Sequence, residues 1–379
     1  MKLLHVTPYA DPVYGGPCVA LRAMAEAASN HGIEVEVVTT NAAGDKNLPL
    51  DDGVVLRNKG VAYHFFRRQF PRSWFCAPGL DRWLAEHVME YDVIHLHVPF
   101  TAPFGAAARK ARSAGVPYVV TPHGLLDPWS LRQKAWKKVP YLQFWERDNL
   151  ARSSVIHATA PAEESFINAL GLGPPVRCLP LAVRVPPVTT DPDFLSGPSR
   201  ILCISRLHPV KALPVVFDAL AQLRAQGRDF VLDLAGGGDA HYVAKLRRRL
   251  KDLGLSDSVV WHGHIGEERK SELYATASCF IQLSHHENFG LAIAEALAAG
   301  LPVVVSDQVG IAPDVEAFRA GKVVAVGDAR GAAEAIEGLT EPNVAGGYRE
   351  RARKLATERY GQDSFASGLV ELYESVICR

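Results

Sequence analysis

Two glutamates with a tight turn between them form the clearest chemical pattern in the sequence. Glu287 precedes the turn formed by residues 288–290, and Glu295 follows it, eight positions after Glu287. The residues after the turn, LAIAEALAAG, predict a short helix that Gly300 ends. The first backbone N–H groups of a helix have no partner within it, so they can bind a phosphate. The stretch therefore predicts a phosphate site between two carboxylates.

The predicted helix is apolar on every side except at Glu295, so we expect it to be buried against a sheet. An ionised carboxylate without a partner in such a place would cost several kcal/mol, roughly the penalty of a desolvated ion. Glu295 therefore needs a partner, and the hydroxyl groups of a ligand are one candidate.

A pair of cations, Arg206 and Lys211, follows another apolar run and precedes a predicted helix at 213–225. Arginine and lysine beside a helix N-terminus suit a diphosphate, which gains negative charge as a sugar leaves it. Taken alone, the pair is more simply interpreted as two surface cations.

The elements that position these residues are short apolar runs, rich in β-branched residues, that alternate with helical stretches. This alternation predicts an α/β protein with parallel sheets and helices on both faces. Ligands of such sheets bind where the strands end. The predicted strands are 3–7, 35–39, 93–97 and 118–121 in the first half, and 201–205, 230–234, 259–262, 279–283, 303–306 and 323–326 in the second.

A proline-rich polar segment separates the two series of strands and predicts a linker at 186–199. The chain then divides into an N-terminal domain at 1–185 and a C-terminal domain at 200–359. Residues 364–377 carry apolar side chains at helical spacing, so a terminal segment at 360–379 is expected to be a helix.

Two glutamates separated by seven residues, with Phe-Gly-Leu between them and Ala-Gly-x-Pro-Val-Val after them, resemble the signature of the retaining glycosyltransferases of family 4, the glycosyl transferases of group 1. The resemblance covers nearly the whole chain and is strongest over 200–306. It implies the GT-B fold, in which two Rossmann-like, doubly wound parallel-sheet domains face each other across a cleft. It also implies that the terminal helix crosses back onto the first domain.

The resemblance implies roles for the residues of the pattern. Glu287 would face the donor sugar, Glu295 would bind the ribose, and the backbone of Phe289, Gly290 and Leu291 would hold the diphosphate. Asn288 belongs to the same turn but stands where the family more often has glycine. Because asparagine tolerates a left-handed backbone, we expect the turn to form.

Four further residues receive roles from the same resemblance. Arg206 and Lys211 would contact the leaving diphosphate, and this outweighs their interpretation as surface cations. Ala212 replaces a frequent glycine beside them. The backbone at Ile265 would receive the nucleobase, in a pattern that suits uracil. His123, in a His-Gly pair after a strand, would contact the donor sugar, although a lone histidine there is more often structural.

Gly15 and Gly16 follow the first predicted strand and precede Pro17, which suits the first turn of a helix. Backbone amides at such a pair can approach a phosphate or sugar closely. A flexible loop without a ligand is an equally good interpretation from the residues alone. The resemblance favours the first interpretation, with the loop facing the donor's diphosphate.

Several other patterns receive no catalytic role. The glycine run at 236–238 lacks the G-x-G-x-x-G spacing of a dinucleotide site, which argues against NAD. His95 and His97 alternate on one strand and are compatible with simple packing. Residues 307–314 depart from the family pattern, and we assign them no role.

Composition bounds the remaining possibilities. The chain has 379 residues, and Lys+Arg and Asp+Glu balance at 41 each, so bulk attraction to nucleic acid is not expected. The six cysteines show no CxxC pair and no nearby histidine ligands, which fits a reducing cytoplasm and argues against a structural zinc site.

Residues 63–83 and 129–147 interleave aromatic and basic side chains. One interpretation is a rim that contacts either an anionic membrane, at the inner face of that membrane, or a lipid-diphosphate-linked acceptor. An equally good one is a solvated face with aromatics covering the core.

The sequence thus predicts a retaining hexosyltransferase (EC 2.4.1) of polysaccharide or glycoconjugate biosynthesis. Its substrates would be a nucleoside-diphosphate sugar, with UDP favoured, and a hydroxyl of a glycan or lipid-linked acceptor. We expect no metal and no cofactor, because Arg206, Lys211 and the helix N-terminus would supply positive charge. The alternatives are a nucleotide-sugar epimerase of the same fold and a catalytically silent nucleotide-binding protein.

Overall fold

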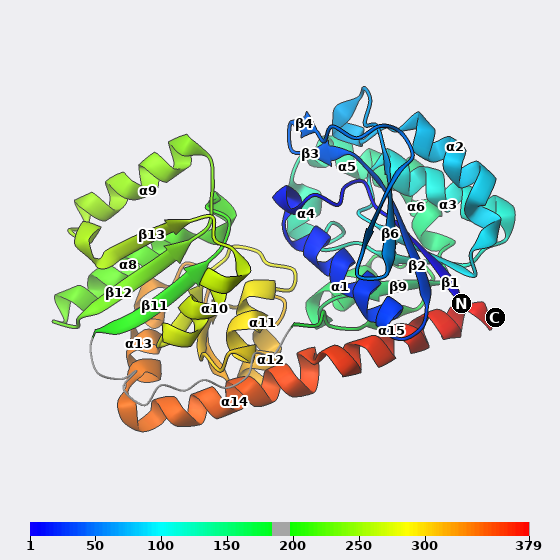
Figure 1. Cartoon of the computed structure of the whole chain (residues 1–379). Coiled ribbons are helices and arrows are strands. Elements are labelled where there is room, and N and C mark those ends of the chain that lie inside the picture. Colours follow the sequence, from blue (N-terminus) through cyan, green and yellow to red (C-terminus); the bar gives the residue numbers. More distant parts are fainter. Residues whose placement is uncertain (184–197, 379) are drawn as a thin grey trace. The chain divides into compact units, whose positions relative to one another are not determined.

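The computed structural model describes residues 1–183 and 198–378 (Figure 1). These residues form two compact units. One contains Met1–Ala182 and the terminal helix that begins at Gln362, and the other contains Val183–Gly361. Residues 186–197 of the predicted linker lie outside the described residues, and Ser199 already belongs to a strand. Each unit has its own sheet and its own core.

The first unit is built on an eight-stranded sheet with the order β10-β9-β8-β7-β1-β2-β6-β5. All neighbouring strands are parallel except β5, which pairs antiparallel with β6. The central strands β7 and β8 are fully buried, as expected for a sheet covered on both faces, and they carry the polar residues His95, His97 and Thr121 among their apolar ones. The strands are β1 (Lys2–Val6), β2 (Glu34–Thr40), β5 (Val54–Asn58), β6 (Val61–Phe66), β7 (Val93–His97), β8 (Tyr118–Thr121), β9 (Val155–Ala158) and β10 (Val176–Cys178), with a small hairpin of β3 (Ala42–Ala43) and β4 (Lys46–Asn47).

Helices cover this sheet and complete the first unit. Helix α15, predicted at 364–377, spans Gln362–Ile377 and packs against α1. It buries the apolar residues whose spacing predicted it, Phe365, Leu369, Leu372 and Val376. The other helices are α1 (Gly16–Asn30), α2 (Pro78–His87), α3 (Ala102–Ala114), α4 (Pro128–Arg132), α5 (Ala135–Tyr141), α6 (Arg147–Ala151) and α7 (Pro161–Ala169), and a π-helical turn, Leu142–Glu146, follows α5.

The second unit is built on a six-stranded parallel sheet with the order β13-β12-β11-β14-β15-β16. Its core lies between this sheet and the flanking helices and contains Phe217, Leu220 and Ile281. The strands are β11 (Ser199–Ile204), β12 (Phe230–Ala235), β13 (Val259–Gly263), β14 (Cys279–Gln282), β15 (Val303–Ser306) and β16 (Gly321–Val324). The helices are α8 (Leu213–Ala225), α9 (Ala240–Asp252), α10 (Glu267–Thr276), α11 (Leu291–Ala298), α12 (Ala312–Ala317), α13 (Ala329–Thr340) and α14 (Pro342–Tyr360).

The structure confirms the prediction of an α/β protein with two doubly wound parallel sheets. All ten predicted strands exist, and the largest displacement is at β16, which begins two residues before the predicted 323–326. The prediction missed β5, β6, β9 and β10 of the first unit. Strands β9 and β10 are short, and β6 lies in the aromatic stretch that also suggested a surface role. No helix among the described residues is long and apolar enough to cross a membrane.

Candidate active site

The strand order of the second unit places a switch point between β11 and β14. From β11 the chain proceeds to β12 and β13 on one side, and β14, β15 and β16 lie on the other side. Loops that leave neighbouring strands in opposite directions open a crevice at the carboxyl edge of such a sheet, and ligands bind there. The loop after β11 carries Arg206 and Lys211, and the loop after β14 carries Glu287. Three of the predicted site residues therefore lie at this switch point.

Lys211 and Glu287 form an ion pair across the switch point. The Lys211 ammonium donates to Glu287 Oε2, and the Gln282 side chain donates to the same oxygen over 2.8 Å. The backbone joins the same loops, since His285 N donates to Val210 O over 2.8 Å. The two charged side chains are only 11% and 22% exposed. The second unit therefore holds a cation and a carboxylate in mutual contact at the edge of its sheet, where both can still reach a ligand.

The segment after β15, to which the sequence assigned no role, fixes the backbone of Glu287. Glu287 N donates to Gln308 O over 3.1 Å, and Gly310 N donates to Glu287 O over 2.8 Å. This pairing holds the glutamate on both sides, so its side chain has a defined direction. The function of the segment is structural support for the site.

The turn before α11 forms, as expected from the sequence. Gly290 has the left-handed backbone, with φ 98° and ψ 58°, whereas Asn288 is not among the residues with positive φ. Gly290 therefore makes the change of direction, and the tolerance of asparagine for that conformation is not used. A Cβ at Gly290 would lie 2.8 Å from Ile293 Cδ1, which also requires glycine there. Phe289 is buried and packs edge-on against Tyr360.

Helix α11 begins at Leu291 without a side-chain cap. Its first turn has no acidic residue, and the N-cap residue is Gly290. Capping side chains usually satisfy the first N–H groups of a helix. Here Ile293 N already donates to Gly290 O over 2.9 Å, and the N–H groups of Leu291 and Ala292 remain available to an anion.

Glu295 has protein partners, so its carboxylate does not depend on a ligand for a partner. Lys270 Nζ donates to Glu295 Oε1 over 2.9 Å, and Tyr274 OH donates to Oε2 over 2.9 Å. The carboxylate is 24% exposed, so it is neither orphaned nor turned into bulk water. Burial lowers the pKa of Lys270, but Glu295 and Glu267 together outweigh burial and raise it overall. Burial and Glu295 together raise the pKa of Tyr274 well above its usual range.

Lys270 and Tyr274 are the site residues that sequence reasoning missed. They are four positions apart on α10, so the helix places them on one face. That spacing was visible in the sequence. Nothing in it indicates that this face of α10 meets α11.

Arg206 is exposed and makes no ion pair with any residue in the described part of the chain. Its backbone is nevertheless fixed, because Ser205 N donates to Ala235 O and Leu207 N donates to Gly237 O. A Cβ on Gly236 would overlap Ser205 O. The glycine run at 236–238 thus allows two loops to approach closely, which explains its composition without a dinucleotide. Ala212, at the predicted glycine position, adopts a left-handed backbone with φ 48°.

Ile265 lies in the loop between β13 and α10 and is half-buried. This loop adjoins the glycine run, since Gly236 N donates to Gly263 O over 2.7 Å and a Cβ on Gly237 would overlap the His264 ring. The loops that carry Arg206 and Ile265 therefore both contact the glycine run at the same edge of the sheet. Lys211, Glu287, Arg206 and Ile265 come together in one unit.

The remaining predicted residues lie in the first unit. Gly15 has φ 74° and caps the N-terminus of α1, as its position before Pro17 predicted. At Gly16 an added Cβ would meet no atom within 4 Å, and its φ is not positive. The protein itself therefore does not require glycine at Gly16, which leaves close approach of a ligand as a reason for it.

His123 follows β8 and has a left-handed backbone, with φ 54°. Its Nε2 lies 3.0 Å from His97 Nδ1. Burial, with a smaller contribution from His157, lowers the pKa of His123 to about 3, so the imidazole is neutral near pH 7. His97, which the sequence analysis treated as packing, is thus the direct partner of a predicted site residue.

Two doubly wound units, each built on its own parallel sheet, have the architecture of the GT-B glycosyltransferases. Comparison with known proteins agrees. A family model described as "Glycosyl transferases group 1" matches residues 183–359, and one described as "Glycosyl transferase 4-like domain" matches residues 15–184. The chain belongs to the group 1 glycosyltransferases of family 4.

Relatives and solved structures resemble the chain over most of its length. It is 28% identical to the D-inositol 3-phosphate glycosyltransferase of Frankia alni, over 81% of this chain and 82% of that protein. It is 24% identical to a GDP-mannose-dependent alpha-(1-6)-phosphatidylinositol monomannoside mannosyltransferase of Mycobacterium tuberculosis, over 78% and 79%. Sucrose-phosphate synthase from Thermosynechococcus elongatus superposes with a TM-score of 0.82 at 20% identity, over 100% and 99% of the chains. Anabaena HepE in complex with UDP and glucose gives 0.78 at 21% identity, over 99% and 100%.

Proposed function

We propose that this glycosyltransferase moves a hexose from a UDP-sugar to a hydroxyl of a glycan or lipid-linked acceptor, with retention at the anomeric carbon and without a metal ion. The observation that carries this proposal is the Lys211–Glu287 pair beside the uncapped N-terminus of α11. A cation, a carboxylate and free N–H groups at one switch point suit the two halves of a nucleotide sugar. The diphosphate is an anion, and the sugar offers hydroxyl groups.

In the proposed reaction the diphosphate lies against the N–H groups of α11. Lys211 then turns its ammonium from Glu287 toward the phosphate, and Arg206, which has no ion-pair partner within the described residues, joins it. As the bond between the sugar and the phosphate breaks, charge grows on the leaving oxygen, and the two cations stabilise it. Released from Lys211, Glu287 accepts hydrogen bonds from the sugar. The acceptor hydroxyl attacks from the face that the phosphate leaves, and the phosphate takes its proton, which retains the anomeric configuration.

The positive groups of this site support a metal-independent reaction. Arg206, Lys211 and the start of α11 can supply the charge that a cation provides in other transferases. The preference for UDP is supported by HepE, whose structure contains UDP. One relative is named for GDP-mannose, so the donor experiment must include both nucleotides.

The experiment is incubation with UDP-glucose, UDP-galactose or GDP-mannose, each with a panel of inositol phosphate, sugar phosphate and lipid-linked acceptors, with and without EDTA. We expect acceptor-dependent release of UDP that EDTA does not abolish, and a product with the donor's anomeric configuration by NMR. An isomerised donor without transfer would identify an epimerase, and binding without turnover a silent protein. Faster release of GDP would replace UDP as the nucleotide, and an inverted anomer would refute retention.

We further propose that the enzyme contacts the inner face of an anionic membrane. The contact would be made by Trp136, Phe144 and Trp145, which we call the aromatic ridge. These side chains, on α5 and the π-helical turn, are 75%, 74% and 62% exposed. Lys137 lies over the Trp136 ring at 4.6 Å. Exposed aromatic rings among lysines suit the boundary between headgroups and acyl chains. In the stretch at 63–83, Tyr63, Phe65 and Phe66 on β6 are buried in the core, whereas Phe70 and Trp74 are exposed.

Vesicle sedimentation tests the membrane contact. The wild-type protein should sediment with vesicles of phosphatidylglycerol and phosphatidylcholine more than with phosphatidylcholine alone. Trp136→Ala with Phe144→Ala should reduce this binding. Met89→Ala is the matched control, because Met89 is 78% exposed in the same unit but lies outside the ridge. Equal recovery with both lipids would refute the proposal.

A further inference from the structure

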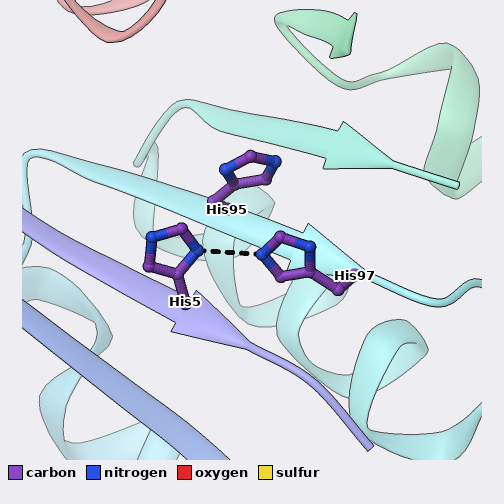
Figure 2. Close-up of side chains that lie close together, drawn as sticks. All are labelled: His5, His95 and His97. Atoms are coloured by element: carbon purple, nitrogen blue, oxygen red, sulfur yellow. Dashed lines mark hydrogen bonds between the residues drawn. The ribbon is translucent and has the colours of Figure 1, made fainter. Parts of the chain in front are cut away.

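A row of three histidines leads from the interior of the first sheet to His123. His5 Nδ1 lies 2.8 Å from His97 Nε2, and His97 Nδ1 lies 3.0 Å from His123 Nε2. We call His5, His97 and His123 the histidine row. His5 is on β1 and His97 is the last residue of β7, so the row spans neighbouring strands at the switch point of the first sheet (Figure 2). His5 and His97 are fully buried, whereas His123 is half-buried.

His95 lies beside the row but belongs to another chain of hydrogen bonds, whose directions can be deduced. His157 Nε2 lies 2.8 Å from Leu179 O, and because a carbonyl only accepts, this nitrogen carries the proton. His157 Nδ1 must then accept from Thr121, whose hydroxyl in turn accepts from His95 Nε2. His95 Nδ1 is left to accept from the Tyr373 hydroxyl at 2.8 Å.

This second chain determines what His5, His95 and His97 can do together. Their ring nitrogens lie within 4.8 Å of one another, a spacing that would suit a metal ion. Both nitrogens of His95 are already engaged, however, one as a donor and one as an acceptor. A metal would have to break the bond from Tyr373 to obtain the lone pair of His95. We therefore interpret the cluster as a hydrogen-bonded array of neutral imidazoles.

Neutral imidazoles carry one proton each, so the protons of the histidine row must all point in the same direction. Burial lowers the pKa of His5 to about 3 and that of His97 well below its usual range, and all three rings are neutral near pH 7. With the protons directed outward, His5 Nδ1 donates to His97 and His97 Nδ1 donates to His123 Nε2. His123 then carries its proton on Nδ1. With the protons directed inward, the proton at the far end lies on His5 Nε2.

The environment of His5 selects the outward direction. His5 Nε2 is buried and has no hydrogen-bond partner among the described residues. A proton there would be a buried donor without an acceptor, and orphaned N–H groups are rarer than under-satisfied acceptors. At the other end, no described residue bonds to His123 Nδ1, and the ring is half-buried rather than enclosed. The outward arrangement leaves the donor where a ligand or water can accept it.

We propose that His5 and His97 are positioning residues that hold His123 in its Nδ1–H tautomer, so that this ring presents a hydrogen-bond donor to a hydroxyl oxygen of the sugar. The contact with the sugar rests on the proposed function, whereas the tautomer does not. A neutral histidine exposed to water favours the proton on Nε2, so the histidine row reverses the ordinary preference. The row also makes the donor independent of pH over the range in which free histidine titrates.

The test is ¹⁵N NMR of the histidine-labelled protein without substrate at pH 7.5, with the His123 signals assigned by loss in His123→Asn. The wild type should show His123 protonated at Nδ1. His97→Leu removes the donor to His123 Nε2, so His123 should shift toward the Nε2–H tautomer. His157→Gln is the matched control, because His157 is equally buried but lies outside the row.

An Nε2–H tautomer in the wild type, or an unchanged tautomer in His97→Leu, would overturn the proposal. If His97→Leu does not fold, the wild-type spectrum still decides. In the transfer assay, His97→Leu should lower kcat/KM for the donor by about tenfold, the effect of one weakened hydrogen bond. If the wild-type protein transfers no sugar, the proposed function is refuted, but the tautomer of His123 can still be judged from the NMR spectra. If the tautomer changes in the variant but kcat/KM does not, the contact between His123 and the sugar is refuted.

Discussion

The histidine network at the carboxyl edge of the first sheet is neutral and largely buried, whereas the ion pairs at the carboxyl edge of the second sheet are charged and partly exposed. The first edge holds the histidine row. It also holds the series of hydrogen bonds that connects the Tyr373 hydroxyl to Leu179 O through His95, Thr121 and His157. The second edge holds the ion pairs Lys211–Glu287 and Lys270–Glu295. Both edges lie at switch points, so the difference is one of chemistry rather than of topology.

The difference follows from what each edge can bind. An anion such as a diphosphate needs cations that can exchange an internal partner for the ligand, and a half-exposed ion pair permits this at small cost. A neutral hydroxyl group needs a donor of fixed direction, and a buried network provides fixed direction best. The first edge should therefore be sensitive to pH through its stability, and the second should be sensitive to the loss of single charges through catalysis.

The largest expected effect is acid destabilisation of the first unit. Burial lowers the pKa of His5 to about 3 and that of His157 to about 4, from 6.5. Below pH 6.5 these histidines bind protons in the unfolded chain but stay neutral in the folded unit. Their contribution to the free energy of unfolding is therefore fully present above about pH 6.5 and is lost as the pH falls toward 4. Each fully buried histidine should contribute about 2 kcal/mol less at pH 5 than at pH 8. Four such groups, His5, His95, His97 and His157, would approach the total stability of a domain.

Urea unfolding of Trp261→Phe at pH 8, 6.5 and 5 measures this effect. Trp261 is the one tryptophan of the second unit, so fluorescence of the variant reports only the first. The urea midpoint should fall steeply below pH 6.5. His157→Gln removes one titrating group. It should lower by about one the number of protons taken up on unfolding, which is given by the pH dependence of the free energy of unfolding. A midpoint that does not change between pH 8 and 5 would mean that the histidines are solvated, and the contrast between the two edges would fail.

The next effect concerns the charges of the second edge. Lys211→Met should lower kcat by about 10²–10³, the usual cost of removing one group that stabilises charge in the transition state. The fold should remain intact, because Gln282 still donates to Glu287. Lys251→Met, at an exposed position in the last turn of α9, is the matched control and should keep wild-type rates. Rates near wild type for Lys211→Met would remove this residue from the site.

The contrast also shows which parts of the site could be predicted from sequence. The α11 turn and the helix after the Arg206–Lys211 segment depend on neighbouring residues, so local patterns predicted them, and α8 has the predicted bounds, Leu213–Ala225. The partners of these residues come from distant segments. Gln308 fixes the backbone of Glu287, and Lys270 pairs with Glu295, but no local pattern indicates which segments meet.

The histidine row shows the same limit in a different form. His95 and His97 are two positions apart, so a strand places them on one face, and this much was visible. Their different partners depend on the pairing of β7 with β1 and β8 and on the position of α15. The direction of the protons depends further on Leu179 O and on the partnerless His5 Nε2. A tautomer is therefore a property of the folded network and not of a motif.

The smallest expected effect tests whether Glu295 binds the ligand or only joins α10 to α11. Glu295→Gln keeps an acceptor for Tyr274 but loses the charge that pairs with Lys270. If the carboxylate accepts hydrogen bonds from the ribose, KM for the donor should rise about tenfold with little change in kcat, because a bond to a charged group is worth about 1.5–3 kcal/mol. Lys270→Met removes the same ion pair but leaves the carboxylate in place, so its KM should change less. Equal effects in the two variants would show that the ion pair matters only for packing, and the second edge would then bind the nucleotide through Arg206, Lys211 and α11 alone.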